Sequence, residues 1–308
     1  MQQQTETLKN VSISPKLVRD LRERVIEFLL FLAAFSSVAT TIAIIVLLVY
    51  ESVEFFGKVS LKEFLTDTQW SPLFADAHYG ILPLVSGTLV TTTIALLVSV
   101  PMGTITAMYL SEFANPRLRE VVKPFLELLA GIPTVVYGYF ALLFVTPLLQ
   151  TVLPDLPGFN MLSAGLVMGI MILPLVSSIS EDAMRSVPLH IREGSYAMGA
   201  TRLQTAWRVV YPSAISGIFA AYILGISRAV GETMIVAIAA GLQPNLTWNP
   251  MDEAATITAY IVQVSLGDLP YGSLEYQTIF AAGLTLVLMT LVFNIIGYFL
   301  SKRYREIY

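Results

Sequence analysis

Two charged residues, Arg228 and Glu232, interrupt an apolar stretch that runs from about Ser213 to Gly241. A charge near the middle of a membrane costs about 2.5–3.5 kcal/mol, and such residues usually face a protein interior or a watery pathway. A guanidinium is a fork of N–H donors that matches the oxygens of a tetrahedral oxyanion. A neighbouring carboxylate repels a fully ionised sulfate but accepts a hydrogen bond from the proton of hydrogen phosphate. The pair therefore favours a pathway for a protonated oxyanion.

A second interpretation of the same pair stays open. On a continuous helix, residues four apart share one face, so Arg228 and Glu232 could neutralise each other and only hold helices together. The sequence also leaves open whether Arg228 meets Glu232 within one helix or reaches across a pathway. A further candidate contact is Tyr137, which follows Pro133 in the Gly131–Tyr139 segment. Irregular backbone at membrane depth lies within protein or lines a cavity, although simple packing explains the segment equally well.

The polar connection from about Glu181 to Pro212 carries several helix signals. Pro188 suits the first turn of a helix, and Thr201 followed by Gln204 is typical of a capping box at the start of another. Gly199 between them can supply a bend. We therefore predict two short helices joined by a turn. These helices could rest on lipid headgroups or dock onto a partner protein, and the residues alone do not decide between the two.

Composition indicates the class of protein that carries these residues. Hydrophobic residues make up 55% of the 308, and charged residues only 13%, about half of what a soluble domain carries. This balance argues against a soluble enzyme, and no P-loop or catalytic triad pattern is present. The chain has no cysteine, and His78 and His190 are far apart, so we predict neither a catalytic residue nor a metal site. A net charge of −4 gives no indication of nucleic-acid binding.

The apolar segments predict an all-α, polytopic membrane protein, since about 20 apolar residues span a bilayer. Pro83, Pro101 and Pro133 mark expected breaks or kinks. Six segments are long enough, at about residues 28–50, 81–110, 125–149, 161–180, 213–241 and 278–300.

The basic residues predict the orientation of these spans. All but three of the 18 Lys and Arg residues fall in the two tails and the connections after the second and fourth spans. The exceptions are Lys58, Lys62 and Arg228. By the positive-inside rule, both termini and the connection at about residues 181–212 are cytoplasmic.

The same connection resembles the EAA loop of ABC-importer permeases. Glu193, Gly199 and Pro212 match that motif at the expected spacing, whereas Gly194 and Ser195 replace its two alanines. The resemblance implies the type I importer permease fold with six transmembrane helices. It also implies that the loop docks onto an ATPase subunit, through residues that include Glu193, Gly194, Ser195, Ala197 and Gly199.

Two further stretches resemble the permeases of phosphate-specific (Pst) ABC importers, namely Gly131–Gly138 and Ser227–Thr233. The segments Trp70–Phe74 and Gly80–Thr88 are more similar to the C-type than to the A-type Pst permease. The resemblance implies that Arg228, Glu232, Thr233 and Tyr137 contact phosphate or line its path.

The resemblance also implies the setting. Residues 1–24 would form a cytoplasmic tail and residues 25–308 a transmembrane permease domain in a bacterial or archaeal cytoplasmic membrane. Expected partners are a second Pst permease, a dimer of ATPase subunits and an extracytoplasmic phosphate-binding protein. The chain itself would bind no cofactor and catalyse no reaction, since ATP is used by the partner ATPase.

Other functions remain as alternatives. The nearest are the A-type Pst permease and a permease for sulfate or molybdate. A secondary transporter or channel would move its substrate without an ATPase, and a membrane receptor or scaffold would transport nothing. The spacing of the loop motif disfavours the secondary transporter.

Overall fold

The computed structural model describes residues 15–303 and divides the chain into two compact units, Met1–Tyr50 and Glu51–Tyr308. The described part of the first unit is a single helix, because α1 (Pro15–Phe56) continues to the boundary and ends within the second unit. Helix α1 passes residues 24 and 25, the expected limit of the tail, without a break. The expected tail residues 1–14, and Arg305 near the other terminus, lie outside the described residues.

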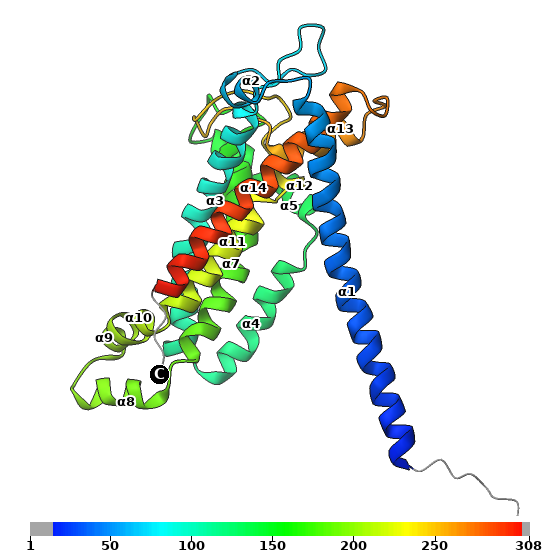
Figure 1. Cartoon of the computed structure of the whole chain (residues 1–308). Coiled ribbons are helices and arrows are strands. Elements are labelled where there is room, and N and C mark those ends of the chain that lie inside the picture. The colour runs from blue at the N-terminus through cyan, green and yellow to red at the C-terminus, as the bar shows by residue number, and fades with distance from the viewer. Residues whose placement is uncertain (1–14, 304–308) are drawn as a thin grey trace, which may run out of the picture. The chain divides into compact units, whose positions relative to one another are not determined.

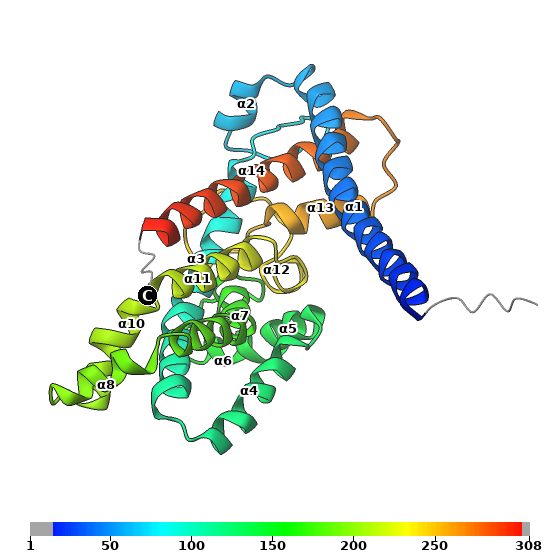
Figure 2. The same cartoon turned by 60° about the horizontal axis from the view of Figure 1, so that its bottom comes forward.

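The second unit is a bundle of helices, and the part of the chain that is described contains no strand, only an isolated bridge between Trp70 and Tyr79. Four long helices run side by side in both views (Figure 1 and Figure 2). They are α3 (Leu82–Met108), α7 (Met161–Arg185), α11 (Ile215–Val230) and α14 (Leu274–Arg303).

Shorter helices gather at the two ends of this bundle (Figure 1). One end, named here the α2 end, carries α2 (Leu61–Thr66) and α13 (Ile257–Ser265). The opposite end, named the α8 end, carries α8 (Leu189–Ala197), α9 (Arg202–Thr205) and α10 (Tyr211–Ser213), with the π-helical segment η3 (Ala206–Val210) between the last two.

Two pairs of helix runs meet at a sharp bend, one within the third predicted span and one where the predicted connection at about residues 181–212 joins the fifth. Helix α4 (Pro116–Ala130) meets the run formed by α5 (Thr134–Phe140), η2 (Ala141–Val145) and α6 (Thr146–Gln150) at 86°. The break falls at Gly131–Pro133, where a break was predicted. The run of α9, η3 and α10 meets α11 at 73°.

The count of spans agrees with six. Among the described residues, four helices are long and apolar enough to cross a membrane, and the two bent pairs raise the number to as many as six. Pro83 lies in the first turn of α3, so it marks the start of that helix rather than a break within it. Pro101 is different, because α3 continues through it and only changes to the π-helical segment η1 (Tyr109–Phe113) after Met108.

The core of the bundle lies between α3 and α7, where small residues allow close approach. Gly165 and Gly169 of α7 face Ile94 and Val98 of α3, and a β-carbon at either glycine would stand within 3.0 Å of those side chains. Close packing of this kind fixes the position of α7, which in turn contacts α11 and α12 (Met234–Ala239).

Candidate functional site

The fifth predicted span breaks between Arg228 and Glu232. Helix α11 ends at Val230, and Gly231 closes it with an N–H bond to the carbonyl of Ser227 at 3.2 Å. Helix α12 begins only at Met234. The expectation that Arg228 and Glu232 share one face of a continuous helix is therefore wrong, because the helix stops between them.

The carboxylate of Glu232 caps α12. Its Oε1 accepts hydrogen bonds from the backbone N–H groups of Met234 at 3.1 Å and Ile235 at 3.3 Å. Its backbone carbonyl accepts a bond from the hydroxyl of Thr258 at 2.6 Å, and the residue is buried. A carboxylate at a helix N-terminus satisfies free N–H groups and interacts favourably with the helix dipole. The negative charge of Glu232 thus has a local partner that is not Arg228.

Arg228 has no carboxylate partner within 4.0 Å among the described residues. Its Nε donates to the sulfur of Met171 on α7 at 3.2 Å, a weak acceptor, and the side chain is exposed. Both terminal nitrogens of the guanidinium lack a hydrogen-bond acceptor in the same described residues. The interpretation of Arg228 and Glu232 as a mutually neutralised pair does not hold in this structure, because each side chain has other contacts.

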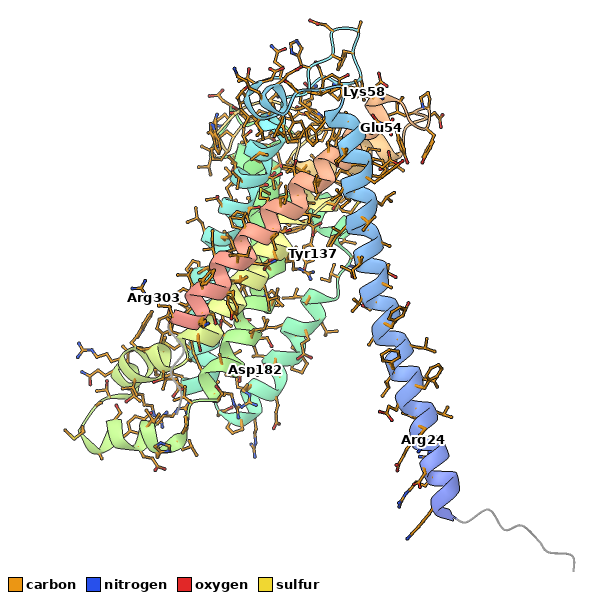
Figure 3. All side chains as sticks on the ribbon, viewed as in Figure 1. Arg24, Glu54, Lys58, Tyr137, Asp182 and Arg303 are labelled. Atoms are coloured by element: carbon orange, nitrogen blue, oxygen red, sulfur yellow. The ribbon has the colours of Figure 1, made fainter. Side chains whose placement is uncertain are left out.

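Tyr137 and Thr233 lie close to this break but use their hydroxyls locally. The Tyr137 hydroxyl donates to the carbonyl of Leu129 at 2.8 Å and so spans the bend between α4 and α5. Tyr137 lies midway between the two ends of the bundle (Figure 3). Thr233 donates to the carbonyl of Gly231 at 3.3 Å. The structure thus places Glu232 and Thr233 at the start of α12, and Tyr137 on α5, which packs against α12.

Close packing holds the two breaks against each other. A β-carbon at Gly138 of α5 would lie 2.9 Å from Cδ1 of Ile238 and 3.1 Å from the carbonyl of Met234, both on α12. Only a residue without a side chain permits this approach of two helices. Met171, Thr258 and Ile238 carry no sequence signal of this role, since each lies in an apolar or small-residue stretch.

The loop at the α8 end has the predicted form of two short helices and a turn. Helix α8 begins after Pro188, and Thr201 and Gln204 form the predicted capping box at the start of α9. Gly199 between them has a φ of +82°, a conformation that favours glycine. A hydrogen bond of 2.9 Å between the hydroxyls of Ser195 and Thr205 joins the two helices.

The residues that match the loop motif are mostly on the surface. Glu193, Gly194, Ala197 and Gly199 are exposed, and a β-carbon at Gly194 would meet no atom within 4 Å. An alanine would therefore fit at Gly194, so this departure from the motif leaves the fold of the loop unchanged. Large apolar side chains are also exposed on the loop, namely Leu189, Tyr196, Met198 and Leu203. Such an apolar surface is typical of an interaction site.

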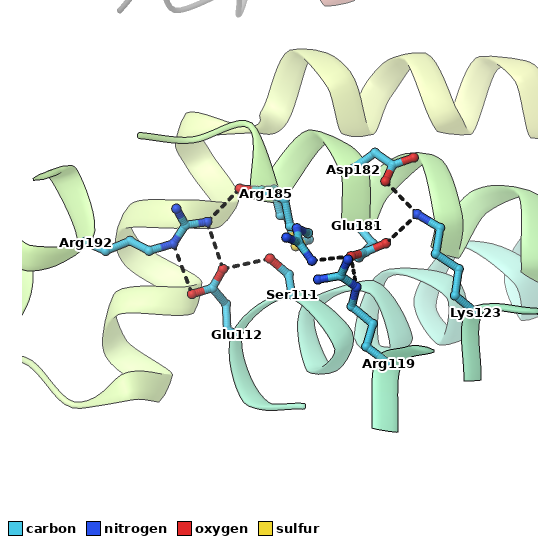
Figure 4. Close-up of polar contacts among 9 residues, drawn as sticks. Ser111, Glu112, Arg119, Lys123, Glu181, Asp182, Arg185 and Arg192 are labelled. Atoms are coloured by element: carbon cyan, nitrogen blue, oxygen red, sulfur yellow. Dashed lines mark hydrogen bonds and ion pairs between the residues drawn. The ribbon is translucent and has the colours of Figure 1, made fainter. Parts of the chain in front are cut away.

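A network of ion pairs fixes this loop to the bundle, and the sequence did not point to it (Figure 4). Arg192 of α8 donates from Nε and from a terminal nitrogen to the two carboxylate oxygens of Glu112, at 3.3 and 3.1 Å. It also donates to the carbonyls of Met184 and Val187. Both partners are largely buried, with the side chains of Arg192 and Glu112 12% and 5% exposed.

A second part of the network centres on Glu181, near the end of α7. Its side chain is 1% exposed and lies within 4.0 Å of three cations (Figure 4). These are Lys123 at 2.9 Å, Arg119 at 3.3 Å and Arg185 at 3.6 Å. Lys123 also pairs with Asp182 at 2.7 Å. Glu181 and Arg185 are four residues apart on α7, but Lys123 and Arg119 are far from Glu181 in sequence, so no local pattern predicts the network.

At the α2 end, a polar pair lies outside the spans. Nδ1 of His78 lies 2.9 Å from a carboxylate oxygen of Asp67. This hydrogen bond raises the pKa of His78 above its ordinary value, and the charges of Asp67 and Asp76 act in the same direction. Partial burial works to raise the pKa of Asp67, but hydrogen bonds from His78 and from the backbone of Gln69 outweigh it and lower that pKa.

Comparison with known proteins agrees with the motifs. A family model described as "binding-protein-dependent transport system inner membrane component" matches residues 99–306. The probable ABC transporter permease protein YqgH of Bacillus subtilis is 35% identical over 302 residues, which cover 96% of this chain and 97% of that protein. The phosphate transport system permease protein PstC of Xylella fastidiosa is 33% identical over 280 residues, which cover 83% of this chain and 86% of that protein. A probable PstC of Methanocaldococcus jannaschii is 32% identical over 74% of this chain and 77% of that protein.

Solved structures agree with the fold. A bacterial ABC transporter involved in the import of the acidic polysaccharide alginate aligns with a TM-score of 0.64 and 17% identity. The alignment covers 94% of this chain and all of that one. The inward-facing methionine transporter MetNI aligns with a TM-score of 0.54 over 74% of this chain and 95% of the other. The chain therefore belongs to the family of binding-protein-dependent transport system inner membrane components, with the type I ABC-importer permease fold, and within that family to the PstC-type permeases.

Proposed function

We propose that the chain is a membrane subunit of an ATP-driven importer of inorganic phosphate and forms half of its translocation pathway. It would pair with a second permease on a dimer of ATPase subunits and receive phosphate from an extracytoplasmic binding protein. The relatives named PstC support phosphate as the substrate. The chain would itself bind no cofactor, with both termini and the α8 end on the cytoplasmic side.

One observation carries the substrate assignment, namely the free guanidinium of Arg228 at the break between α11 and α12. A cation in a membrane span without a carboxylate partner is stabilised by an anion that arrives from outside the chain. The two terminal nitrogens of Arg228 donate no hydrogen bond to a described residue, so they remain available to two phosphate oxygens. Arg228 would thus contact the phosphate directly.

Glu232 takes a narrower role than a simple counter-charge. Its Oε1 is used by the N–H groups of α12, whereas Oε2 has no hydrogen-bond donor among the described residues. That second oxygen would accept the proton of hydrogen phosphate, which bare sulfate lacks. Thr233 and Tyr137 would line the path beside it, and Tyr137 would mainly hold the bend of α4 and α5 in place.

The loop at the α8 end would couple transport to ATP hydrolysis. Glu193, Gly194, Ser195, Ala197 and Gly199 would form or shape the surface that enters the ATPase subunit. The exposed apolar side chains on this loop support the proposal that a partner protein covers them in the assembled complex. Arg192 would pass the movement of α8 to η1 and α7 through its bonds to Glu112 and to the carbonyl of Met184.

The decisive experiment is ATP-dependent uptake of labelled phosphate by the reconstituted complex, comparing wild type with Arg228→Gln. We expect uptake to be lost while the complex still assembles and hydrolyses ATP. Arg303→Gln, at an exposed position at the end of α14, is the matched control and should keep full uptake.

Two outcomes would overturn the proposal in different ways. Full uptake by Arg228→Gln would remove Arg228 from the path. Inhibition by excess sulfate as strong as by phosphate would favour a general oxyanion permease for sulfate or molybdate. Glu232→Gln should weaken the preference for phosphate over sulfate without abolishing assembly.

A further inference from the structure

A group of arginines surrounds a pocket at the α8 end, and the lining of this pocket does not include Arg228. The pocket, named here the arginine pocket, has a volume of about 310 Å³. The side chains used below are part of its lining and come from η1, α4, α7 and α8, namely Glu112, Pro116, Arg119, Arg185 and Arg192. No span or motif described above accounts for it.

The charges around the arginine pocket do not balance. Arg192 and Glu112 neutralise each other through their two hydrogen bonds. Beside them, Arg119, Lys123 and Arg185 share the two carboxylates of Glu181 and Asp182, so the positive charges exceed the negative charges by one. Arg119 and Arg185 contact the same Oε1 of Glu181 (Figure 4). Arg119 does so through Nε at 3.3 Å and Arg185 through a terminal nitrogen at 3.6 Å.

Each of these two guanidiniums therefore has spare N–H donors. The contact of Arg119 uses Nε only, and that of Arg185 uses one terminal nitrogen at a distance too long for a hydrogen bond. Both side chains line the pocket and are partly exposed, at 31% and 42%. Two adjacent guanidinium forks with free donors match the several oxygens of one phosphate group.

The start of α4 adds positive potential from another source. Pro116, the first residue of this 15-residue helix, lines the pocket together with Ala114. The side chain of Asn115 accepts the N–H of Leu118 at 2.7 Å, so the helix is capped, but the positive end of its dipole still faces this side. An anion in the pocket would experience both the guanidiniums and the helix terminus.

We propose that the arginine pocket binds a phosphate group, held by Arg119 and Arg185 and supported by the N-terminus of α4. Inorganic phosphate and the headgroup of an anionic lipid share this chemistry. The bound group joins α4 to the end of α7 directly beside α8. Its occupancy therefore stiffens the connection between the spans and the loop.

The test uses the full-length chain in lipid nanodiscs, with Arg228→Gln as the background so that the proposed translocation site is removed. One arm titrates inorganic phosphate in phosphatidylcholine nanodiscs. The other replaces part of the lipid with phosphatidic acid and contains no free phosphate. The readout is hydrogen–deuterium exchange of the α4 first turn and of the α7–α8 junction.

We expect exchange to slow in at least one arm, and the arm that responds identifies the source of the phosphate group. Arg119→Gln with Arg185→Gln should weaken the response by about tenfold for each guanidinium removed. Arg117→Gln, at an exposed residue on the same helix, is the matched control and should respond as the background does. Arg119→Lys with Arg185→Lys retains the charges for Glu181 but loses the forks, and should bind at an intermediate level.

The folding of each variant is checked in the same data by the exchange of the α3–α7 core, which must stay unchanged. No response to phosphate or to phosphatidic acid would overturn the proposal. So would an equal response to chloride at the same ionic strength, or an undiminished response in the double Gln variant. Because every sample carries Arg228→Gln, the outcome does not depend on whether Arg228 transports phosphate, which the uptake assay measures separately.

Discussion

The α8 end of the bundle and the break between α11 and α12 treat charge in opposite ways. At the α8 end, Glu112 and Glu181 are buried and each is bonded to cations that come from other helices. At the break, Arg228 has no carboxylate within 4.0 Å among the described residues, and Glu232 serves as a helix cap. The contrast indicates that buried carboxylates hold the helices of the first region together, whereas no described carboxylate pairs with Arg228 at the break.

The largest expected effect tests the rigid region. Glu181→Met leaves Arg119, Lys123 and Arg185 around an apolar side chain and should lower the free energy of unfolding by about 3–5 kcal/mol. Thermal unfolding in detergent measures the loss. Asp182→Asn is the control, since Asp182 is largely exposed and its pair with Lys123 should contribute less than about 1 kcal/mol. Equal losses from both variants would contradict the picture of a buried centre at Glu181.

The same chemical change in the two regions sharpens the comparison. Arg192→Gln strands the buried carboxylate of Glu112 and should cost about 3 kcal/mol of stability. Arg228→Gln removes only the contact to Met171 and should change stability by less than about 1 kcal/mol. Denaturant or thermal unfolding of both variants, side by side, gives the two values. A large loss from Arg228→Gln would mean that Arg228 has a structural role.

A smaller effect tests the packing between the two breaks. Gly138→Ala inserts a methyl group against Ile238 and the carbonyl of Met234, and overpacking of this kind costs about 1–3 kcal/mol. Gly194→Ala is the matched control on the open surface of α8, where alanine should stabilise the helix by up to about 1 kcal/mol. Opposite signs in unfolding midpoints are expected, and a neutral Gly138→Ala would show that α5 and α12 can move apart freely.

The smallest expected effect is the pH-dependent contribution to stability of the partly exposed pair formed by His78 and Asp67. Because the pKa of His78 is raised by Asp67, the pair stabilises the fold fully below the ordinary histidine pKa of about 6.5 and loses this contribution as the pH rises through the higher folded-state value. On the acid side, the lowered pKa of Asp67 means that its contribution is present above about pH 3.9 and lost as the pH falls through the folded-state value.

His78→Gln should therefore lower the unfolding midpoint at about pH 6 and leave it unchanged at about pH 9. Asp67→Asn should remove the same pH dependence. A constant difference between wild type and His78→Gln at both pH values would show that the imidazole acts through packing rather than charge.

Local signals explain what could be predicted from the sequence. The turn at Gly199, the capping box of Thr201 and the break at Pro133 depend on residues within a few positions of one another, and the structure confirms all three. The break at Gly231 was missed because apolar residues continue on both sides of it and one glycine does not distinguish a helix end from a helix interior.

The features that could not be predicted from the sequence depend on tertiary contacts. Glu112 and Arg192 are 80 positions apart, and the carboxylate of Glu232 acts as a cap only because the helix ends before it. The choice of Arg228 as a candidate contact depended on its type and its apolar surroundings alone. That choice stays a prediction until uptake is measured.

The open space around Gly194 has a practical consequence. A side chain added there meets no neighbouring atom, and the chain contains no cysteine. A single cysteine at this position would therefore be the only thiol available for a fluorescent or spin label. Such a label would report directly whether the surface of α8 is covered by a partner during ATP turnover.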